Sequence, residues 1–223
     1  MSLTSSSSLS PPYGAHPTIV TNVQFSGDAE SSACSLYLHY SLPPLLFVDP
    51  YELDMRQQEY TVVGLKGKGA RELEKPVHAL PDEDGIEVIL KTNSVMEQVH
   101  LPIHVRYGKP TFNTSYVVQP LDAPTVVLAC SSSEAGFPAC TRSSRLIPKF
   151  LLDSLPSLPS SSCLVSTPDQ HPLEISIPLG NTADLPTVEL GTALVILACF
   201  AWVAWEGWRV SVRLGRREKA KKL

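Results

Sequence analysis

The segment Leu190–Trp205, LGTALVILACFAWVAW, decides the architecture of this chain, because sixteen consecutive residues carry no formal charge. It is followed at once by the basic segment Glu206–Leu223, EGWRVSVRLGRREKAKKL. A membrane-spanning helix satisfies its backbone polar groups internally and needs about 20 mostly apolar residues. With a few flanking residues at the two interfaces, the segment predicts a single transmembrane helix over residues 187–208.

A buried helix in a soluble core would show a similar apolar run, but two features favour the membrane. Trp202, Trp205 and Trp208 gather at one end of the segment, as in an aromatic belt, and the basic flank follows. Lys and Arg next to a spanning helix remain in the cytosol. Residues 209–223 are therefore predicted to be a cytosolic tail, and the preceding domain is predicted to face the lumen.

The tail ends in KAKKL, which fits a lysine-based retrieval signal for the endoplasmic reticulum or, equally, a plain basic flank. Charge is divided unevenly along the chain, whose formal net charge is −4. Of the 22 acidic residues 19 precede the predicted helix, against 11 of the 18 basic residues. The large N-terminal part is thus acidic, which argues against nucleic-acid binding.

Residues 1–17, MSLTSSSSLSPPYGAHP, are rich in Ser and Pro and are predicted to be disordered. The stretch has no apolar h-region, so a conventional signal peptide is not expected there. Three explanations stay open for a lumenal domain: an earlier natural start, insertion directed by the helix itself, or a reversed topology with a cytosolic domain.

Residues 18–130 are predicted to form an all-β domain of the β-sandwich type. Short strand-like segments recur between turns rich in Gly and Pro, and the chain has 20 prolines, which disfavour a helical bundle. In the strand expected over Cys34–Tyr40, one face is expected to carry Leu36, Leu38 and Tyr40. The expected strands are Cys34–Tyr40, Tyr60–Leu65, Gly85–Lys91, Val99–Tyr107, Tyr116–Gln119 and Pro124–Cys130.

The segment Val99–Tyr107, VHLPIHVRY, alternates strictly between apolar and other residues. Its apolar set is expected on one face, with His100, Pro102, His104 and Arg106 on the other. Proline cannot donate a ladder hydrogen bond, so this strand is expected at a sheet edge or with a bulge.

Residues 131–186 are dominated by Ser and Pro and are predicted to be a loose stalk or a long insertion. One further strand is conceivable over His171–Pro178, HPLEISIP, where apolar residues alternate again.

Cys34, Cys130, Cys140 and Cys163 precede the predicted helix, and Cys199 lies within it. In an oxidising lumen four cysteines allow three pairings. A Cys130–Cys140 bridge is the first choice because it encloses a short loop rich in Ser, Gly and Pro. In the cytosol the same residues would remain free thiols.

Asn113, in Asn113-Thr114-Ser115, begins the only N-x-S/T sequon of the chain and follows a turn-like Lys-Pro pair. It is predicted to carry a glycan if the domain is lumenal.

The sequence shows no nucleophile with a base and an orienting group, so no catalytic residue is predicted. The acidic cluster Asp82–Asp84 is expected to be a solvated turn, and the run Lys66–Gly69 lacks the phosphate-loop pattern. No metal site and no cofactor are predicted. The proline-braced segment Pro43–Leu53 is expected either in the core or as a preformed contact surface.

Three motifs together resemble the PIG-X family. Leu38–Leu53, LHYSLPPLLFVDPYEL, is similar to the segment that opens the family's domain, and Leu101–Tyr107, LPIHVRY, is similar to its second hallmark strand. Pro124–Cys130 resembles the segment that follows, and the single C-terminal span agrees as well. The resemblance covers roughly residues 34–130 and the predicted helix.

This resemblance implies a non-catalytic subunit of glycosylphosphatidylinositol (GPI) mannosyltransferase I in the endoplasmic reticulum membrane. The implied partner is the multispanning catalytic subunit of the PIG-M type, which adds the first mannose to the GPI-anchor precursor and which the family member stabilises. The expected contact residues are Pro43, Pro44, Phe47, Asp49, Tyr51, His104 and Arg106. Two alternatives stay open: a membrane-tethered lumenal hydrolase or transferase using His100, His104 or Asp49, and a cytosolic-facing adaptor.

Overall fold

The computed structural model describes residues 2–26, 34–70, 72–80, 85–92, 98–130, 138–140, 146–158, 161–166 and 172–221. The chain divides into two compact units. The larger unit, which we call the β domain, comprises Met1–Lys109 and Thr114–Gly180. The smaller unit comprises Pro110–Asn113 and Asn181–Leu223.

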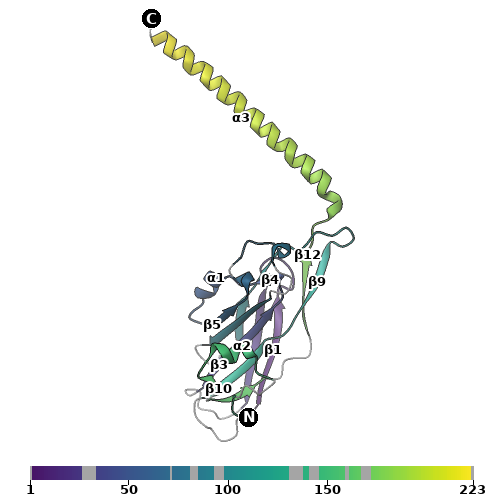
Figure 1. Ribbon diagram of the computed structural model, residues 1–223, viewed down its shortest axis with the longest axis vertical. Coiled ribbons are helices and arrows are strands. Elements are labelled where there is room, and N and C mark those ends of the chain that lie inside the picture. The colour runs from purple at the N-terminus through teal and green to yellow at the C-terminus, as the bar shows by residue number, and fades with distance from the viewer. Residues whose placement is uncertain are drawn as a thin grey trace. The chain divides into compact units, whose positions relative to one another are not determined.

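The β domain is built from twelve short strands and two short α-helices in the described part of the chain (Figure 1). Its strands are β1 (Ser2–Ser10), β2 (Thr18–Ser26), β3 (Cys34–Leu42), β4 (Leu46–Phe47), β5 (Tyr60–Lys66), β6 (Ile86–Thr92), β7 (Gln98–Pro102), β8 (His104–Val105), β9 (Tyr116–Leu121), β10 (Thr125–Cys130), β11 (Ser162–Val165) and β12 (Leu173–Pro178). Its helices are α1 (Pro50–Asp54) and α2 (Lys149–Ser154), with single 3₁₀ turns η2 (Lys68–Ala70) and η3 (Val77–Ala79).

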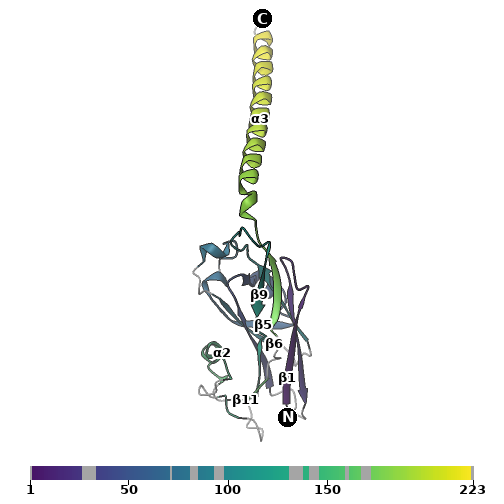
Figure 2. The same cartoon turned by 90° about the vertical axis from the view of Figure 1, so that its right-hand side faces the viewer.

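The strands form antiparallel sheets that enclose one main core. A five-stranded sheet has the order β11-β10-β3-β6-β5, and a three-stranded sheet has the order β1-β2-β7. The pairs β12-β9 and β4-β8 complete the set. Figure 2 shows the sheet with β1 and the sheet with β5 and β6 side by side. The main core joins side chains from both: Ile19 and Val23 of β2, Leu36, Leu38 and Tyr40 of β3, Val88 and Leu90 of β6, Leu101 of β7, and Ile175 and Ile177 of β12.

This arrangement confirms the predicted all-β, sandwich-like fold. Leu36, Leu38 and Tyr40 lie on one face of β3, as expected, and all are buried. The hydroxyl of Tyr40 lies 3.1 Å from Thr21 Oγ1 of β2, so a hydrogen bond joins the two sheets across the core. This partner matters because an unpaired hydroxyl in the core would be costly.

A second, smaller core covers the opposite face of the five-stranded sheet. Tyr37 of β3 and Ile89 of β6 contribute to it, and α2 supplies Leu151 and Leu152. β5 has a bulge between Val62 and Gly64. Glycine at position 64 leaves room for α2, because a Cβ there would lie 2.8 Å from Ile89 Cδ1 and 3.2 Å from Phe150 Cζ. The central sheet is therefore buried on both faces, which explains why β3 and β6 carry few exposed residues.

The prediction that residues 1–17 are disordered is wrong for Ser2–Ser10, which form strand β1. Over its whole length β1 pairs with β2, from Ser2 opposite Ser26 to Ser10 opposite Thr18. Leu3 is buried, and Leu9 packs against the main core. Hydrogen bonding to β2, together with two leucines on one face, orders a segment that its composition alone marks as polar.

The segment Val99–Tyr107 changes partners part-way. β7 is the edge strand of its sheet and pairs with β2, while β8 pairs with β4. Pro102 ends β7 at this edge, as expected. Ile103 between the strands is buried, and alternation shifts after it, so that Arg106 is 3% and Tyr107 88% exposed. The expected faces of Arg106 and Tyr107 are thus reversed, because the strand bends between two sheets.

The prediction of a loose stalk over residues 131–186 is wrong for the described parts of that range. They supply α2, β11 and β12, and Leu151, Leu158 and Ile177 are buried in the two cores. The strand considered over His171–Pro178 is β12, Leu173–Pro178, paired with β9.

Two disulfides fasten the β domain, and neither is the Cys130–Cys140 bridge expected from sequence. Cys34 pairs with Cys130, and Cys140 with Cys163. Cys34 and Cys130 lie directly opposite each other on β3 and β10, with 4.1 Å between their Cα atoms. The first-choice bridge is excluded because this pairing consumes Cys130. Cys199 is the free cysteine of the described residues.

The smaller unit consists chiefly of one long helix, α3 (Leu185–Lys221), preceded by the 3₁₀ turn η5 (Thr182–Asp184). Asn181 caps this turn by accepting a hydrogen bond from the Ala183 backbone N–H at 2.9 Å. Within the described chain, Thr182–Gly215 is the one helical stretch long and apolar enough to cross a membrane, and its most apolar 18-residue window has a mean hydropathy of 1.9. None of its most apolar window is buried, so its Leu, Phe and Trp side chains need an apolar surrounding.

Candidate partner-binding surface

The proline-braced segment Pro43–Leu53 serves both as core and as surface. Leu46, Val48 and Leu53 are buried in the main core. Between them the chain exposes Tyr51, at 78% of its surface, and leaves the other expected contact residues half-buried: Pro43, Pro44, Phe47 and Asp49. The sequence offered core and contact surface as alternatives, and the structure divides the segment between the two.

Local hydrogen bonds hold this segment in shape. The Leu46 N–H donates to the Pro43 carbonyl at 2.9 Å, which closes the turn before β4. Asp49 is the N-cap of α1, since its Oδ1 accepts from the Tyr51 N–H at 2.8 Å, and Pro50 occupies the first turn. Asp49 therefore has a structural task, and α1 presents Tyr51 outward from a fixed backbone.

Phe47 is enclosed by two residues of the neighbouring segment. The His104 ring stacks on it with 5.1 Å between centroids and 25° between planes. The Arg106 guanidinium also lies over the Phe47 ring, 4.4 Å from its centroid. These contacts fix β4 against β8 beyond the two residue pairs of their ladder.

His104 is the centre of a small polar cluster. Its Nε2 lies 2.8 Å from Glu52 Oε2, and its Nδ1 lies 2.8 Å from Nδ1 of His16. His100 is separate from this cluster and hydrogen-bonds Gln98 on the same strand. His100, His104 and Asp49, named for the enzymatic alternative, are thus not brought together.

Arg106 is a buried scaffold residue and not the exposed contact that its strand position suggested. Its guanidinium donates to the backbone carbonyls of Gly69 (2.6 Å), Glu72 (2.8 Å), Leu73 (3.2 Å) and Lys75 (2.7 Å). Burial lowers the pKa of Arg106, and the Glu72 charge opposes that effect. These four bonds hold the connection between β5 and η3, where the chain has little regular structure of its own.

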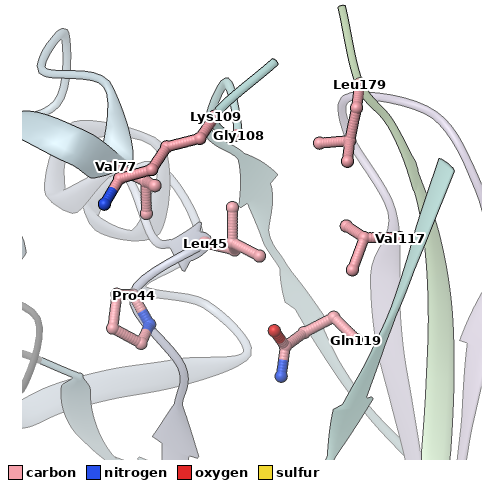
Figure 3. Close-up of a pocket in the computed structure, with 8 residues that line it drawn as sticks. All are labelled: Pro44, Leu45, Val77, Gly108, Lys109, Val117, Gln119 and Leu179. Atoms are coloured by element: carbon pink, nitrogen blue, oxygen red, sulfur yellow. The ribbon is translucent and has the colours of Figure 1, made fainter. Parts of the chain in front are cut away.

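An open apolar groove lies beside this connection, with a volume of about 350 Å³. Figure 3 shows its two walls: Pro44, Leu45, Val77 and Lys109 on one side, and Val117, Gln119 and Leu179 on the other. Gly108 belongs to the first wall. A Cβ at this glycine would lie 2.5 Å from Leu179 Cδ2, so glycine permits the close approach of the two walls there.

Among the groove residues, the sequence pointed to Pro44 as a contact residue and to Leu45 only as part of the segment Pro43–Leu53. The others come from segments far apart in the chain, and only the pairing of β9 with β12 and the turn after β8 bring them together. The one local signal was the alternation in Tyr116–Gln119, which places Val117 and Gln119 on the same face.

Within the described residues no group of three or more His, Cys, Asp or Glu side chains is arranged to hold a metal ion. The acidic cluster Asp82–Asp84 lies outside the described residues. What the surface offers is apolar contact area and aromatic rings on a braced backbone, an arrangement suited to binding a protein surface.

Asn113 of the predicted sequon is exposed and belongs to the smaller unit. Its neighbour Thr111 pairs with Asn181, and the Thr111 carbonyl accepts from the Thr182 N–H at 3.1 Å. The sequon is therefore tied to the turn that begins α3.

Comparison with known proteins adds evidence of a different kind. The sequence model of a family described as PIG-X / PBN1 matches residues 12–208. The chain is similar to "GPI alpha-1,4-mannosyltransferase I, stabilizing subunit" of Mus musculus, with 23% identity over 201 residues, which are 83% of this chain and 74% of the mouse protein.

Fungal proteins named PBN1 are similar as well. The Debaryomyces hansenii protein is 27% identical over 124 residues, 55% of this chain and 26% of that protein. The Neurospora crassa protein is 23% identical over 224 residues, 92% of this chain and 43% of that protein. This chain thus spans less than half the length of these two fungal relatives.

Proposed function

Because the chain belongs to the PIG-X / PBN1 family, we propose that it is the stabilising, non-catalytic subunit of GPI α-1,4-mannosyltransferase I. The observation that carries the proposal is the extent of the family match. It covers residues 12–208, which include most of the β domain and the apolar part of α3. The mouse relative whose name states this role is similar over most of both chains.

The proposed location is the endoplasmic reticulum membrane, with the β domain in the lumen and the C-terminus in the cytosol. The basic residues that follow Trp208 support this orientation. The two disulfides also support it, because such bridges form and persist in oxidising compartments. A lumenal β domain would meet the lumenal loops of a multispanning catalytic subunit, which is the proposed partner.

The mechanism we propose is stabilisation by mass action. A subunit that binds only the folded form of its partner raises the partner's free energy of unfolding, by about 2.7 kcal/mol at a free concentration 100 times the dissociation constant. A marginally stable membrane enzyme would otherwise lose molecules to degradation. No bond is made or broken by this chain in that scheme.

The proposed contact surface consists of the exposed part of the proline-braced segment and its neighbour His104: Pro43, Pro44, Phe47, Asp49, Tyr51 and His104. Arg106 supports this surface, because its buried guanidinium lies against the ring of Phe47. The membrane-spanning part of α3 adds a second contact, because Gly191, Thr192 and Ala193 permit close helix packing in lipid.

Depletion of this chain tests the proposal. We expect loss of GPI-anchored proteins from the cell surface and a fall in the catalytic subunit's protein level, with its messenger RNA unchanged. Re-expression of the full chain restores both. Unchanged levels of catalytic subunit and surface proteins after depletion would contradict the function.

The contact surface is tested by a pair of variants in the re-expressed chain. Tyr51→Ala removes the most exposed aromatic of the surface, and Tyr13→Ala removes an aromatic of similar exposure elsewhere. We expect Tyr51→Ala to restore less catalytic subunit than the wild-type chain does, and Tyr13→Ala to restore it fully.

A further inference from the structure

Apart from Pro44, the proposed contact surface does not use the residues of the apolar groove between Leu45 and Leu179. Its side chains are mostly aliphatic, and Leu45, Val117 and Leu179 are only half-buried. Sites that bind small molecules have volumes of about 300–1,000 Å³. A groove of about 350 Å³ therefore has room for a few apolar side chains.

The walls of the groove are held in place before anything binds. Val77 is the first residue of η3, and its backbone N–H donates to the Tyr107 carbonyl at 3.3 Å. The backbone before η3 is fixed by the Arg106 guanidinium, which binds the carbonyls of Glu72 and Lys75. On the opposite wall the Leu179 N–H donates to the Ser115 carbonyl at 2.8 Å, which continues the β9-β12 ladder. A preformed groove loses little entropy when it is filled.

A short covalent tether joins one wall of this groove to α3. Only six residues lead from Leu179 to Leu185, where α3 begins. Six extended residues span at most about 21 Å. Lys109 is likewise the last residue of the β domain before the chain first enters the smaller unit. Leu179, one wall residue of the groove, can therefore lie at most about 21 Å from Leu185 along the chain.

The rim of the groove carries one exposed positive charge, on Lys109. Among the described residues no ion pair involves this lysine, whereas Lys66 and Lys75 each pair with a glutamate. A ligand with an acidic group beside its apolar side chains would complement this rim.

We propose that the groove receives apolar side chains from a lumenal loop of the membrane-embedded catalytic subunit, with an acidic residue of that loop facing Lys109. This inference rests on the proposed function and names the docking site. A loop that leaves a membrane helix starts at the lipid surface, and the tether from Leu179 to the start of α3 is short. Hydrocarbon chains of lipids are the competing occupant.

Site-specific photocrosslinking in the full chain tests the occupant. A photoreactive residue replaces Gln119, which lines the groove, and in a matched control it replaces Val118, the outward-facing neighbour on β9. Both chains are co-expressed with the epitope-tagged catalytic subunit and irradiated in intact membranes. We expect a crosslink to the tagged subunit from position 119, with at least a tenfold lower yield from position 118.

Two results would overturn the docking site: crosslinks from position 119 to lipid or to a second copy of this chain only, or equal crosslinking to the catalytic subunit from both positions. Depletion of the chain separates this failure from failure of the function. If depletion still lowers the catalytic subunit, the function stands and the groove is not its binding site.

Filling the groove gives an independent measurement. Val117→Trp places an indole in the groove, and Val118→Trp places the same indole on the outer face of β9. We expect Val117→Trp to reduce the catalytic subunit co-purified with the chain about tenfold, and Val118→Trp to leave it unchanged. Lys109→Glu should reduce the yield as well, while Lys149→Glu, at an exposed lysine of α2, should not. Equal yields from the two tryptophan variants, with both chains retaining their disulfides and membrane insertion, would contradict the proposal.

Discussion

The guanidinium of Arg106 lies over the ring of Phe47, with 4.4 Å between Cζ and the ring centroid. The same guanidinium donates four hydrogen bonds to backbone carbonyls between Gly69 and Lys75. One buried side chain therefore connects the β4-β8 pair to the segment that leads from η2 to η3. The proposed contact surface and one wall of the groove depend on this connection.

Replacing Arg106 by lysine is expected to lower the free energy of unfolding by about 2 kcal/mol or more. An ammonium group cannot reach four carbonyls at once, and it forms a poorer contact with the ring of Phe47. Denaturant unfolding of the detergent-solubilised full chain measures the change. Arg56→Lys, at an exposed ion pair of 3.7 Å with Glu59, is the control and should shift stability by less than about 0.5 kcal/mol. Equal stability of the two variants would refute the scaffold role of Arg106.

The two disulfides are expected to differ in their effect on stability. The Cys34–Cys130 bridge spans 96 residues, and Cys140–Cys163 spans 23. In the chain-entropy account the longer loop contributes about 4.7 kcal/mol and the shorter about 3.4 kcal/mol. Cys34→Ala with Cys130→Ala should therefore lower the unfolding midpoint more than the equivalent pair at Cys140 and Cys163.

Peptide mapping under non-reducing conditions checks the pairing itself. A linked peptide pair containing Cys34 and Cys130 is expected, and a Cys130–Cys140 link would contradict the structure. Cys199→Ser is the control, because this free cysteine lies in the membrane helix and should not change the unfolding of the β domain.

Stability is expected to fall in mildly acidic solution because of His39. Burial lowers the pKa of His39 from its ordinary value of 6.5, although its hydrogen bond to Glu87 opposes the shift. The folded state thus favours the neutral imidazole. The stabilising contribution is complete above pH 6.5 and is lost as the pH falls through the lowered pKa of the folded state.

Ionised Glu87 also stabilises the folded state, and its contribution is lost at a lower pH than that of His39. Burial opposes its ionisation, but hydrogen bonds from Lys66 and His39 outweigh burial and lower its pKa from 4.5. Its contribution is present above pH 4.5 and is lost as the pH falls through the folded value. Unfolding free energies measured from pH 8 to pH 4 should show both losses. His39→Gln should remove the loss that begins near pH 6.5, while His100→Gln should keep it.

A side chain at Gly64 is expected to displace α2. A Cβ there would lie 2.8 Å from Ile89 Cδ1, 3.1 Å from Ser154 Oγ and 3.2 Å from Phe150 Cζ. Gly64→Ala should therefore cost about 1–3 kcal/mol in thermal or denaturant unfolding. Phe150→Leu in the same chain should recover part of that loss, because it shortens one of the obstructing side chains. Strict additivity of the two substitutions would show that α2 does not pack on Gly64.

Asn113 is expected to carry an N-linked glycan in cells, because it is exposed and the β domain is proposed to be lumenal. Endoglycosidase treatment of a membrane preparation should increase the electrophoretic mobility of the wild-type chain. Asn113→Gln and Ser115→Ala should each abolish the shift, while Asn22→Gln, outside any sequon, should keep it. Digestion of the β domain by protease added to sealed microsomes would contradict the lumenal placement.

Much of the β architecture could be predicted from local pattern. The alternation in Cys34–Tyr40 predicts β3, because a buried strand face needs apolar residues at every second position. The β-rich run Gly85–Lys91 predicts β6. The apolar run and basic flank at the C-terminus predict α3 for a similarly local reason. β1 was missed because its sequence, SLTSSSSLS, has only two leucines, and its order comes from pairing with β2.

The binding surface was less accessible to sequence reasoning, because its geometry depends on contacts between distant residues. Strict alternation placed Arg106 outward, and only the change of partner strand at Ile103 turns it into the protein. The Cys34–Cys130 bridge depends likewise on the β3-β10 register, which joins segments 96 residues apart. The two walls of the groove likewise lie opposite each other only because strand pairing brings distant segments together.

The place of β12 in the main core has a consequence for biosynthesis. Ile177 is buried among side chains of β strands made much earlier, and α3 begins at Leu185, shortly after it. A ribosome that has just added Ile177 still shields it, so the sandwich cannot close until a good part of the anchor has also been translated. Translation of the apolar helix and completion of the fold are thus nearly simultaneous, so the finished surface of the β domain first exists when the anchor is also at hand.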